Sequence, residues 1–215
     1  MLGHIMSELD PLAQGALLSE PTAPASTTPA DPAAWQHWAE RVRDAAARGA
    51  CLRVRGGGSK DHLGDTTHGE LLDTRECQGI VAYEPSELVI RARAGTALAE
   101  VEAVLAERGQ HLAFEPPRFA FHAGAPSAAT LGGVVASGLS GPGRVSRGAV
   151  RDHVLGCTLM NGRAEVMRFG GAVMKNVAGF DLSRLMAGSM GTLGLLLDVT
   201  LKVMPQPVVS ATMRF

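Results

Sequence analysis

Six consecutive residues, Arg55-Gly56-Gly57-Gly58-Ser59-Lys60, have the composition of an anion-binding loop. The three glycines carry no Cβ, so their backbone N–H groups can turn toward one point and approach a ligand closely. Ser59 adds a hydroxyl donor, and Arg55 and Lys60 place a positive charge at each end. The pattern predicts a cradle for a phosphate or pyrophosphate. Because glycine clusters are also ordinary loop composition, the alternative is a surface turn without a ligand.

A second segment, between residues 124 and 141, consists almost wholly of small residues. Side chains this small let the backbone lie flat against a ring, and the serines and threonines among them supply hydroxyl groups. The alternative is a small-residue helix packed tightly against a neighbour. We expect this segment to bind the same ligand as the cradle. The hydroxyl groups come from Ser127, Thr130, Ser137 and Ser140.

Periodic patterns predict the elements that must position these two segments. An amphipathic helix is expected to begin at Asp31-Pro32, with Asp31 as N-cap, and to place Trp35, Trp38, Val42, Ala45 and Ala46 on one core-facing side. Two further helices are predicted at 96–108 and 181–186. Strands are predicted at 51–54, 70–73, 79–83, 87–93, 154–160, 165–169 and 195–203, with Asn161-Gly162 as a hairpin turn. The pattern indicates an α+β fold of two lobes.

Composition narrows the class of protein. The 215 residues carry a formal charge of -1, so no general basic field would attract nucleic acid or an anionic membrane. No apolar run approaches the length of about 18 residues that spans a bilayer. The three cysteines, Cys51, Cys77 and Cys157, form no metal-binding or redox pair, and we expect them to be small buried residues in a reducing compartment. Residues 1–31 are rich in proline and small polar residues and are expected to be mobile.

Several familiar site patterns are missing. The cradle is no P-loop, and residues 141–146 begin like a dinucleotide fingerprint but carry Ser146 where the third glycine belongs. The histidines have no ligand spacing, so no metal site is predicted. No serine, cysteine or histidine lies in a nucleophile motif, and the sequence predicts no catalytic residue.

Five motifs in order resemble the FAD-binding domain of the vanillyl-alcohol oxidase/PCMH flavoprotein superfamily. They are residues 55–60, Ala94-Gly95-Thr96, Thr130-Leu131-Gly132-Gly133, residues 148–152 and residues 188–194. Within that superfamily, residues 170–186 resemble the FAD-binding subunits of bacterial glycolate oxidases. The likeness spans roughly residues 33 to 207.

The resemblance implies a PCMH-type domain of two α+β subdomains, at about 32–120 and 121–207, that hold FAD between them. Residues 208–215 would begin a truncated cap domain. The cradle would hold the pyrophosphate, joined by residues 124–130, of which the predicted ligands are Gly124, Ala125, Pro126, Ser127 and Thr130. The ribityl and ring side would be lined by residues 131–133 and 137–140, with Leu131, Gly132, Gly133, Ser137, Gly138 and Ser140 as the predicted contacts. Residues 191–196 would lie along the adenine. The residues implied there are Gly191, Thr192, Leu193, Gly194 and Leu196. Relatives that tether flavin use a histidine near the first loop, where this chain has Ser59 and Lys60, so FAD is expected to be non-covalent.

The resemblance also implies an activity and partners. The flavin would take two electrons from a 2-hydroxy acid, oxidising glycolate to glyoxylate, with a second flavoprotein subunit and an iron–sulfur subunit as partners. The location would be cytoplasmic, with contact to the inner membrane only through partners. Alternatives are another FAD-linked enzyme of the superfamily, such as one like D-lactate dehydrogenase or a cell-wall precursor reductase, and a non-catalytic subunit scaffold.

Overall fold

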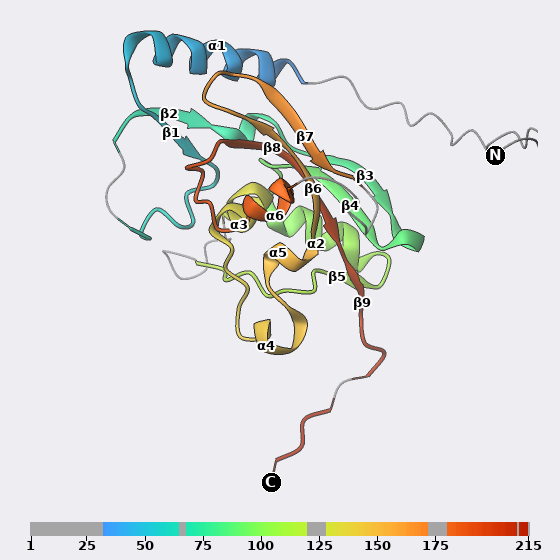
Figure 1. The fold of residues 1–215 in the computed structure, drawn as a ribbon. Helices are drawn as coiled ribbons and strands as arrows, with labels where there is room; N and C mark the ends of the chain where they lie inside the picture. Colours follow the sequence, from blue (N-terminus) through green and yellow to red (C-terminus); the bar gives the residue numbers. More distant parts are fainter. Residues whose placement is uncertain (1–31, 65–67, 120–127, 172–179, 210, 215) are drawn as a thin grey trace, which may run out of the picture. The chain divides into compact units, whose positions relative to one another are not determined.

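A computed structural model describes residues 32–64, 68–119, 128–171, 180–209 and 211–214 (Figure 1). They form an α+β fold, as the sequence predicted. The expected mobile segment, residues 1–31, lies outside the described residues. No helix in the described part of the chain combines the length and the apolar character needed to cross a membrane.

The fold is built on a five-stranded sheet in which every neighbouring pair is antiparallel. Strand β8 lies at its centre and is buried over all but its last residue, which explains the long apolar run in the sequence. The strands, in spatial order, are β3 (Ile80–Glu84), β4 (Val89–Arg93), β8 (Leu195–Lys202), β6 (Val154–Met160) and β7 (Val166–Gly170).

A shift in register affects which residues of β8 face each side of the sheet. Thr158 of β6 pairs with Asp198, but Leu159 pairs with Leu196, so Leu197 has no residue opposite it. The extra residue changes the alternation of side chains along the strand. Leu197 therefore joins the core under α1, while Leu196 and Val199 join the core on the other face.

Helix α1 (Ala33–Arg48) covers one face of the sheet (Figure 1). Trp35 and Trp38 are each only 2% exposed and pack with Leu195 and Leu197, which confirms the two tryptophans as core anchors. Pro32 is the N-cap, one residue later than predicted, and Ala46 is exposed instead of facing the core. The helix ends at Gly49, whose φ of 63° is the left-handed conformation that glycine adopts readily.

Short helices and turns connect the strands, and several of them contribute buried residues to the larger core on the opposite face. These elements are η1 (Thr74–Glu76), η2 (Pro85–Glu87), α2 (Leu98–Ala106), α3 (Leu131–Ser137), α4 (Arg144–Arg147), α5 (Val150–His153) and α6 (Leu182–Leu185). Two small sheets complete the fold. In one, β1 (Leu52–Arg55) pairs in parallel with β2 (Glu70–Asp73), and in the other β5 (Gln110–His111) pairs with β9 (Met204–Pro205).

The expected boundary near residue 120 does not separate two sheets. Strands β3 and β4 precede it and β6, β7 and β8 follow it, yet β4 is hydrogen-bonded to β8 over five residue pairs. Strands β1 and β2 form a small separate sheet that lies wholly before that point. The cradle lies in the connection between these two strands.

Candidate flavin-binding site

The cradle loop, residues 55–60, begins where β1 ends. Strand β1 runs parallel to β2, and η1 follows β2 directly, so Thr74 lies beside the start of the loop. The Thr74 hydroxyl donates a hydrogen bond to the Arg55 carbonyl, with an oxygen–oxygen distance of 3.4 Å. The sheet therefore fixes the direction in which the loop leaves β1.

The glycines of the cradle let it pack directly on the chain before α3. A Cβ on Gly56 would overlap the side-chain oxygen of Thr130, and one on Gly57 would overlap the carbonyl oxygen of Ala128. No side chain could be placed between these backbones without moving one of them. The cradle and the described part of the small-residue segment, residues 128–140, consequently lie side by side, although about 70 residues separate them in sequence.

Helix α3 is held in place by the same kind of close contact. Thr130 is its N-cap and accepts a hydrogen bond from the Gly133 N–H at 3.4 Å. A Cβ on Gly132 would come within 2.7 Å of the Ala94 Cβ, so the helix lies tightly against the end of β4. The small residues thus form a packed helix, the alternative weighed for the sequence, and that helix also lines the pocket described below.

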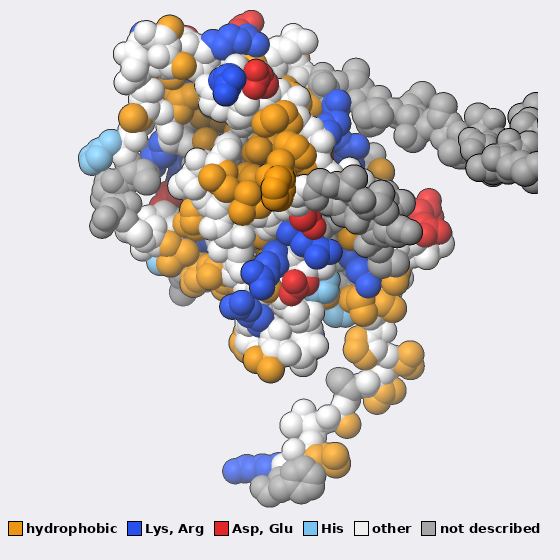
Figure 2. All heavy atoms as spheres, in the orientation of Figure 1, with side chains coloured by type: hydrophobic (Ala, Val, Ile, Leu, Met, Phe, Trp, Pro, Cys, Tyr) orange, Lys and Arg blue, Asp and Glu red, His pale blue; other side chains and the backbone are white. Residues whose placement is uncertain are grey.

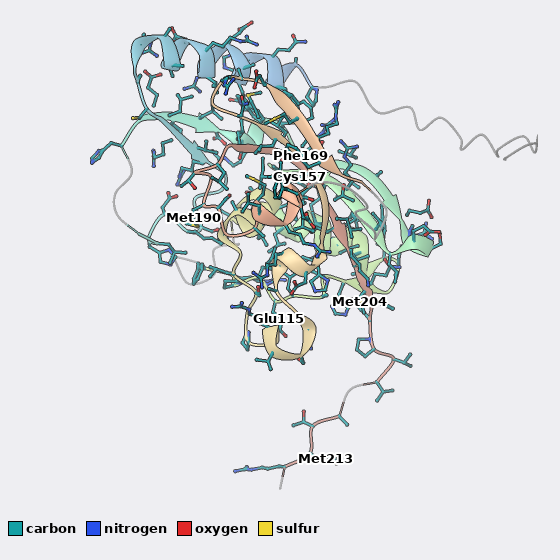
Figure 3. All side chains as sticks on the ribbon, viewed as in Figure 1. Glu115, Cys157, Phe169, Met190, Met204 and Met213 are labelled. Carbon is teal, nitrogen blue, oxygen red and sulfur yellow. The ribbon has the colours of Figure 1, made fainter. Side chains whose placement is uncertain are left out.

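The turn before β8 forms the third wall. Met190 donates its N–H to the Ala136 carbonyl at 2.8 Å, and Gly188 donates to the Val135 carbonyl at 3.1 Å. Met190 adopts a φ of 53°, which is uncommon for a residue with a side chain. Its side chain is 52% exposed, and Figure 3 shows it beside α3.

These three segments enclose a pocket of about 200 Å³. Its walls come from the cradle and the turn after it, from Thr74 and Ala94, from α3, and from the turn that leads into β8. The lining residues are Val54, Arg55, Gly56, Gly57, Gly58, Ser59, Lys60, Asp61, Leu63, Thr74, Ala94, Thr130, Gly132, Gly133, Ala136, Ser137, Ser189, Met190, Gly191, Gly194, Leu195 and Leu196.

Among the described residues, three titratable side chains line this pocket, namely Arg55, Lys60 and Asp61. Arg55 pairs with Asp61 at 2.6 Å, and its guanidinium lies against Gly58, where a Cβ would overlap it. Lys60 has no ion pair among the described residues, and its Nζ lies 3.4 Å from the hydroxyl oxygen of the buried Ser59. Burial lowers the pKa of Lys60 from its ordinary value.

The cradle also offers unused backbone donors. Within the described residues, the N–H groups of residues 56–60 donate to no backbone or side-chain acceptor, whereas the N–H of Asp61 bonds to the Gly58 carbonyl. Groups of this kind bind an anion well because they are fixed and need no counter-charge of their own. Small residues on α3 leave room for a flat group. The pocket therefore fits a ligand that is flat in one part and anionic in another, as FAD is.

The structure brings together most of the residues predicted to bind the ligand. Those that line the pocket are Arg55, Gly56, Gly57, Gly58, Ser59, Lys60, Thr130, Gly132, Gly133, Ser137, Gly191, Gly194 and Leu196. Gly124, Ala125, Pro126 and Ser127 lie outside the described residues.

Five predicted residues do not line the pocket. Leu131 is fully buried in the core beneath α3, and Gly138 ends that helix with a φ of 64°. Ser140 is buried and accepts the Val150 N–H at 3.0 Å, which joins it to α5. Thr192 is exposed and donates its hydroxyl to the Ser189 carbonyl at 2.6 Å, and Leu193 is 50% exposed.

Sequence reasoning missed several lining residues. Asp61 directly follows the cradle and could have been weighed as the partner of Arg55. Ala94 belongs to a motif that was noted, but its role as the floor under Gly132 depends on packing. Ser189 belongs to the motif at 188–194 but was not among the predicted ligand-binding residues. For Thr74 the sequence offers no signal, because this residue reaches the pocket only through the turn that follows β2.

The cysteines and histidines give no site in the part of the chain described. Cys77 and Cys157 are buried as expected, but Cys51 is exposed, which corrects the prediction that all three are buried. Burial raises the pKa of Cys157 to about 12. No cluster of metal-binding side chains occurs among the described residues.

Comparison with known proteins agrees with this geometry. Residues 30–170 match the family described as FAD binding domain. The glycolate oxidase subunit GlcE of Escherichia coli K12 is 48% identical over 175 residues, which are 81% of this chain and 48% of that protein. A D-lactate dehydrogenase of Anaerostipes hadrus is 31% identical over 140 residues, 65% of this chain and 28% of that enzyme.

The glycolate oxidase subunit GlcD of Bacillus subtilis is 36% identical over 84 residues, 39% of this chain and 18% of that protein. The chain thus spans about half the length of GlcE and less of the other two. The family match covers well over half of the chain and includes the cradle and α3. This chain belongs to the FAD binding domain family.

Proposed function

We propose that this chain binds one FAD non-covalently in the pocket and is the flavin-binding part of a glycolate oxidase subunit. The cradle would hold the pyrophosphate through its backbone N–H groups. The α3 wall and the turn before β8 would hold the flat parts of the cofactor. The domain would extend over about 32–207.

One observation carries the proposal. The unused N–H groups of residues 56–60 belong to a loop that lines the same pocket as α3, because Gly56 and Gly57 pack without side chains on Ala128 and Thr130. A turn without a ligand would leave these donors to water and would need no such docking. The docked cradle is therefore typical of a built anion site and not of a simple surface turn.

The described pocket supports binding more directly than catalysis. Among the described residues its titratable groups are one ion pair and one lysine, and none of them is a histidine or an unpaired carboxylate of the kind that commonly serves as a general base. FAD, when bound, supplies the two-electron chemistry, and this chain positions it. Turnover would then require substrate-facing groups from other parts of the assembly.

The partners would be the other subunits of a glycolate oxidase, a second flavoprotein and an iron–sulfur protein. The surface supports a chain that works with partners, because Figure 2 shows hydrophobic side chains gathered over α6 and β7. The exposed residues there include Val166, Phe180 and Leu185, which are 39%, 93% and 55% exposed. The location would be cytoplasmic, with contact to the inner membrane through those partners.

A second candidate function is oxidation of D-lactate. The 31% identity to a D-lactate dehydrogenase over 65% of this chain favours it. The cradle and α3 would serve both enzymes in the same way, because they contact the cofactor and not the substrate. A subunit scaffold without flavin is the remaining alternative.

Flavin content and substrate-dependent reduction separate these functions. The purified chain is expected to bind FAD in a one-to-one ratio and to release it on denaturation, as a non-covalent cofactor does. With its partner subunits and without oxygen, glycolate should bleach the bound flavin faster than D-lactate does. Faster bleaching by D-lactate would favour the second candidate, and a folded protein that binds no FAD would leave only the scaffold.

A further inference from the structure

The two cationic side chains of the cradle, Arg55 and Lys60, differ in whether a carboxylate of the described residues pairs with them. Arg55 is the first residue of the loop, and both its Nε and a terminal nitrogen contact the same Asp61 oxygen, at 2.7 and 2.6 Å. The guanidinium also fills the space beside Gly58. Arg55 is thus neutralised within the loop and closes its turn, although the sequence suggested it as a phosphate ligand.

Lys60 makes no comparable ion pair within the described residues. Among the described residues no carboxylate pairs with its ammonium, and its one polar contact is the Ser59 hydroxyl at 3.4 Å. It lines the pocket next to the unused backbone donors. Lys60 is therefore the one described cation on these walls whose charge is not already balanced by a carboxylate.

We propose that Lys60, and not Arg55, supplies the charge that recognises the phosphates of the bound dinucleotide, and that Asp61 holds Arg55 in a structural role. This rests on the proposed function. A half-buried ammonium without a counter-ion is costly in the empty pocket, and the lowered pKa of Lys60 has the same cause. A pyrophosphate beside it would remove that cost and gain a charge-assisted hydrogen bond.

Two matched variants test the assignment, since Lys60→Gln and Arg55→Gln each remove one positive charge from the same loop. FAD affinity is measured by fluorescence titration at several salt concentrations, and folding by circular dichroism. Lys60→Gln is expected to weaken FAD binding about 10- to 100-fold and to reduce its salt dependence. Arg55→Gln should weaken binding less than about threefold but lower the thermal midpoint. Lys60→Arg, which keeps a charge, should restore most of the affinity.

Two results would overturn the inference. One is a loss of FAD affinity in Arg55→Gln as large as that in Lys60→Gln, and the other is an unchanged FAD affinity in Lys60→Gln. If Arg55→Gln fails to fold, the double variant Arg55→Gln/Asp61→Asn removes the ion pair as a unit, and the same comparison with Lys60→Gln applies. Failure of the wild-type chain to bind FAD would instead overturn the proposed function, so the two failures are distinguishable.

Discussion

Gly57 lies so close to the carbonyl oxygen of Ala128 that a methyl group at position 57 would occupy the same space. This contact joins the cradle to the segment before α3 and makes both of them walls of one pocket. Two stretches distant in sequence therefore act as one binding surface because a side chain is missing from one of them.

Gly57→Ala is expected to separate the two walls. The cradle must move away from Ala128, which should lower the free energy of unfolding by about 1–3 kcal/mol and weaken FAD binding. Gly162→Ala is the matched control, because a Cβ at Gly162 would contact nothing within 4 Å. Chemical denaturation and FAD titration measure the two effects. Equal behaviour of the two variants would show that the docking of the cradle is unimportant.

Asp198 should be the most sensitive carboxylate of the sheet. It is 1% exposed and accepts hydrogen bonds from Arg91 at 2.8 Å and Thr158 at 2.9 Å, with Arg93 at 3.5 Å. Arg93 in turn lies 4.7 Å from the Trp35 ring of α1. Asp198→Asn would leave buried positive charge unbalanced and is expected to cost about 3–5 kcal/mol of the free energy of unfolding.

The control for Asp198 is Asp44→Asn, which removes an exposed partner of Arg48 on α1. It should leave the denaturation midpoint almost unchanged, because exposed ion pairs contribute little. A similar midpoint for both variants would contradict the role of the buried cluster.

Much of the fold follows from local sequence patterns, which predicted individual helices and strands but not how the strands are ordered in the sheet. The tryptophan stripe predicted α1, and apolar runs bounded by turn residues predicted the strands of the large sheet. The order of those strands did not follow, because β4 meets β8 across a sequence separation of about 100 residues. The Asn161-Gly162 turn is also longer than predicted, since the Asn161 side chain accepts the N–H groups of Arg163 and Glu165 and opens a five-residue loop.

In the site, too, local sequence patterns predicted some features, whereas others depend on long-range packing. Glycines and hydroxyl residues identified the cradle and α3, because few segments of an ordinary packed domain combine so many of both. The division of roles between Arg55 and Lys60 could not be predicted, since it depends on how the turn brings Asp61 back to Arg55. Nor could it be predicted that Leu131 and Ser140 do not line the pocket, because this depends on how α3 packs on the core and on the hydrogen bond that Ser140 accepts from the Val150 N–H.

The three thiols should react at different rates. Cys51 is exposed, whereas burial raises the pKa of both Cys77 and Cys157 and keeps them as unreactive thiols. A chromogenic disulfide reagent at neutral pH is expected to modify one thiol quickly in the native protein and all three after denaturation. Cys51→Ser should abolish the fast phase. Rapid modification of two or more thiols in the native state would contradict the buried positions.

Lys60 predicts opposite effects of alkaline pH on binding and stability. Its pKa lies below the ordinary value of 10.5, so the folded apo protein binds fewer protons than the unfolded chain between that lowered pKa and 10.5. The contribution of Lys60 to stability should therefore rise with pH across this window, while FAD affinity falls as the ammonium is lost. The free energy of unfolding and the FAD affinity are each measured across this pH range for the wild type and for Lys60→Gln, and the difference between the two proteins is compared at each pH. If the difference between wild type and Lys60→Gln stays the same at every pH, Lys60 does not titrate in this window.

Amide hydrogen exchange with and without FAD tests the central claim most directly, because it reports on the backbone donors themselves. Added FAD is expected to slow exchange in residues 56–60 and across α3, and to leave β3 unchanged. Protection that appears elsewhere, while exchange in residues 56–60 and α3 stays the same, would contradict a flavin dinucleotide held between these two segments.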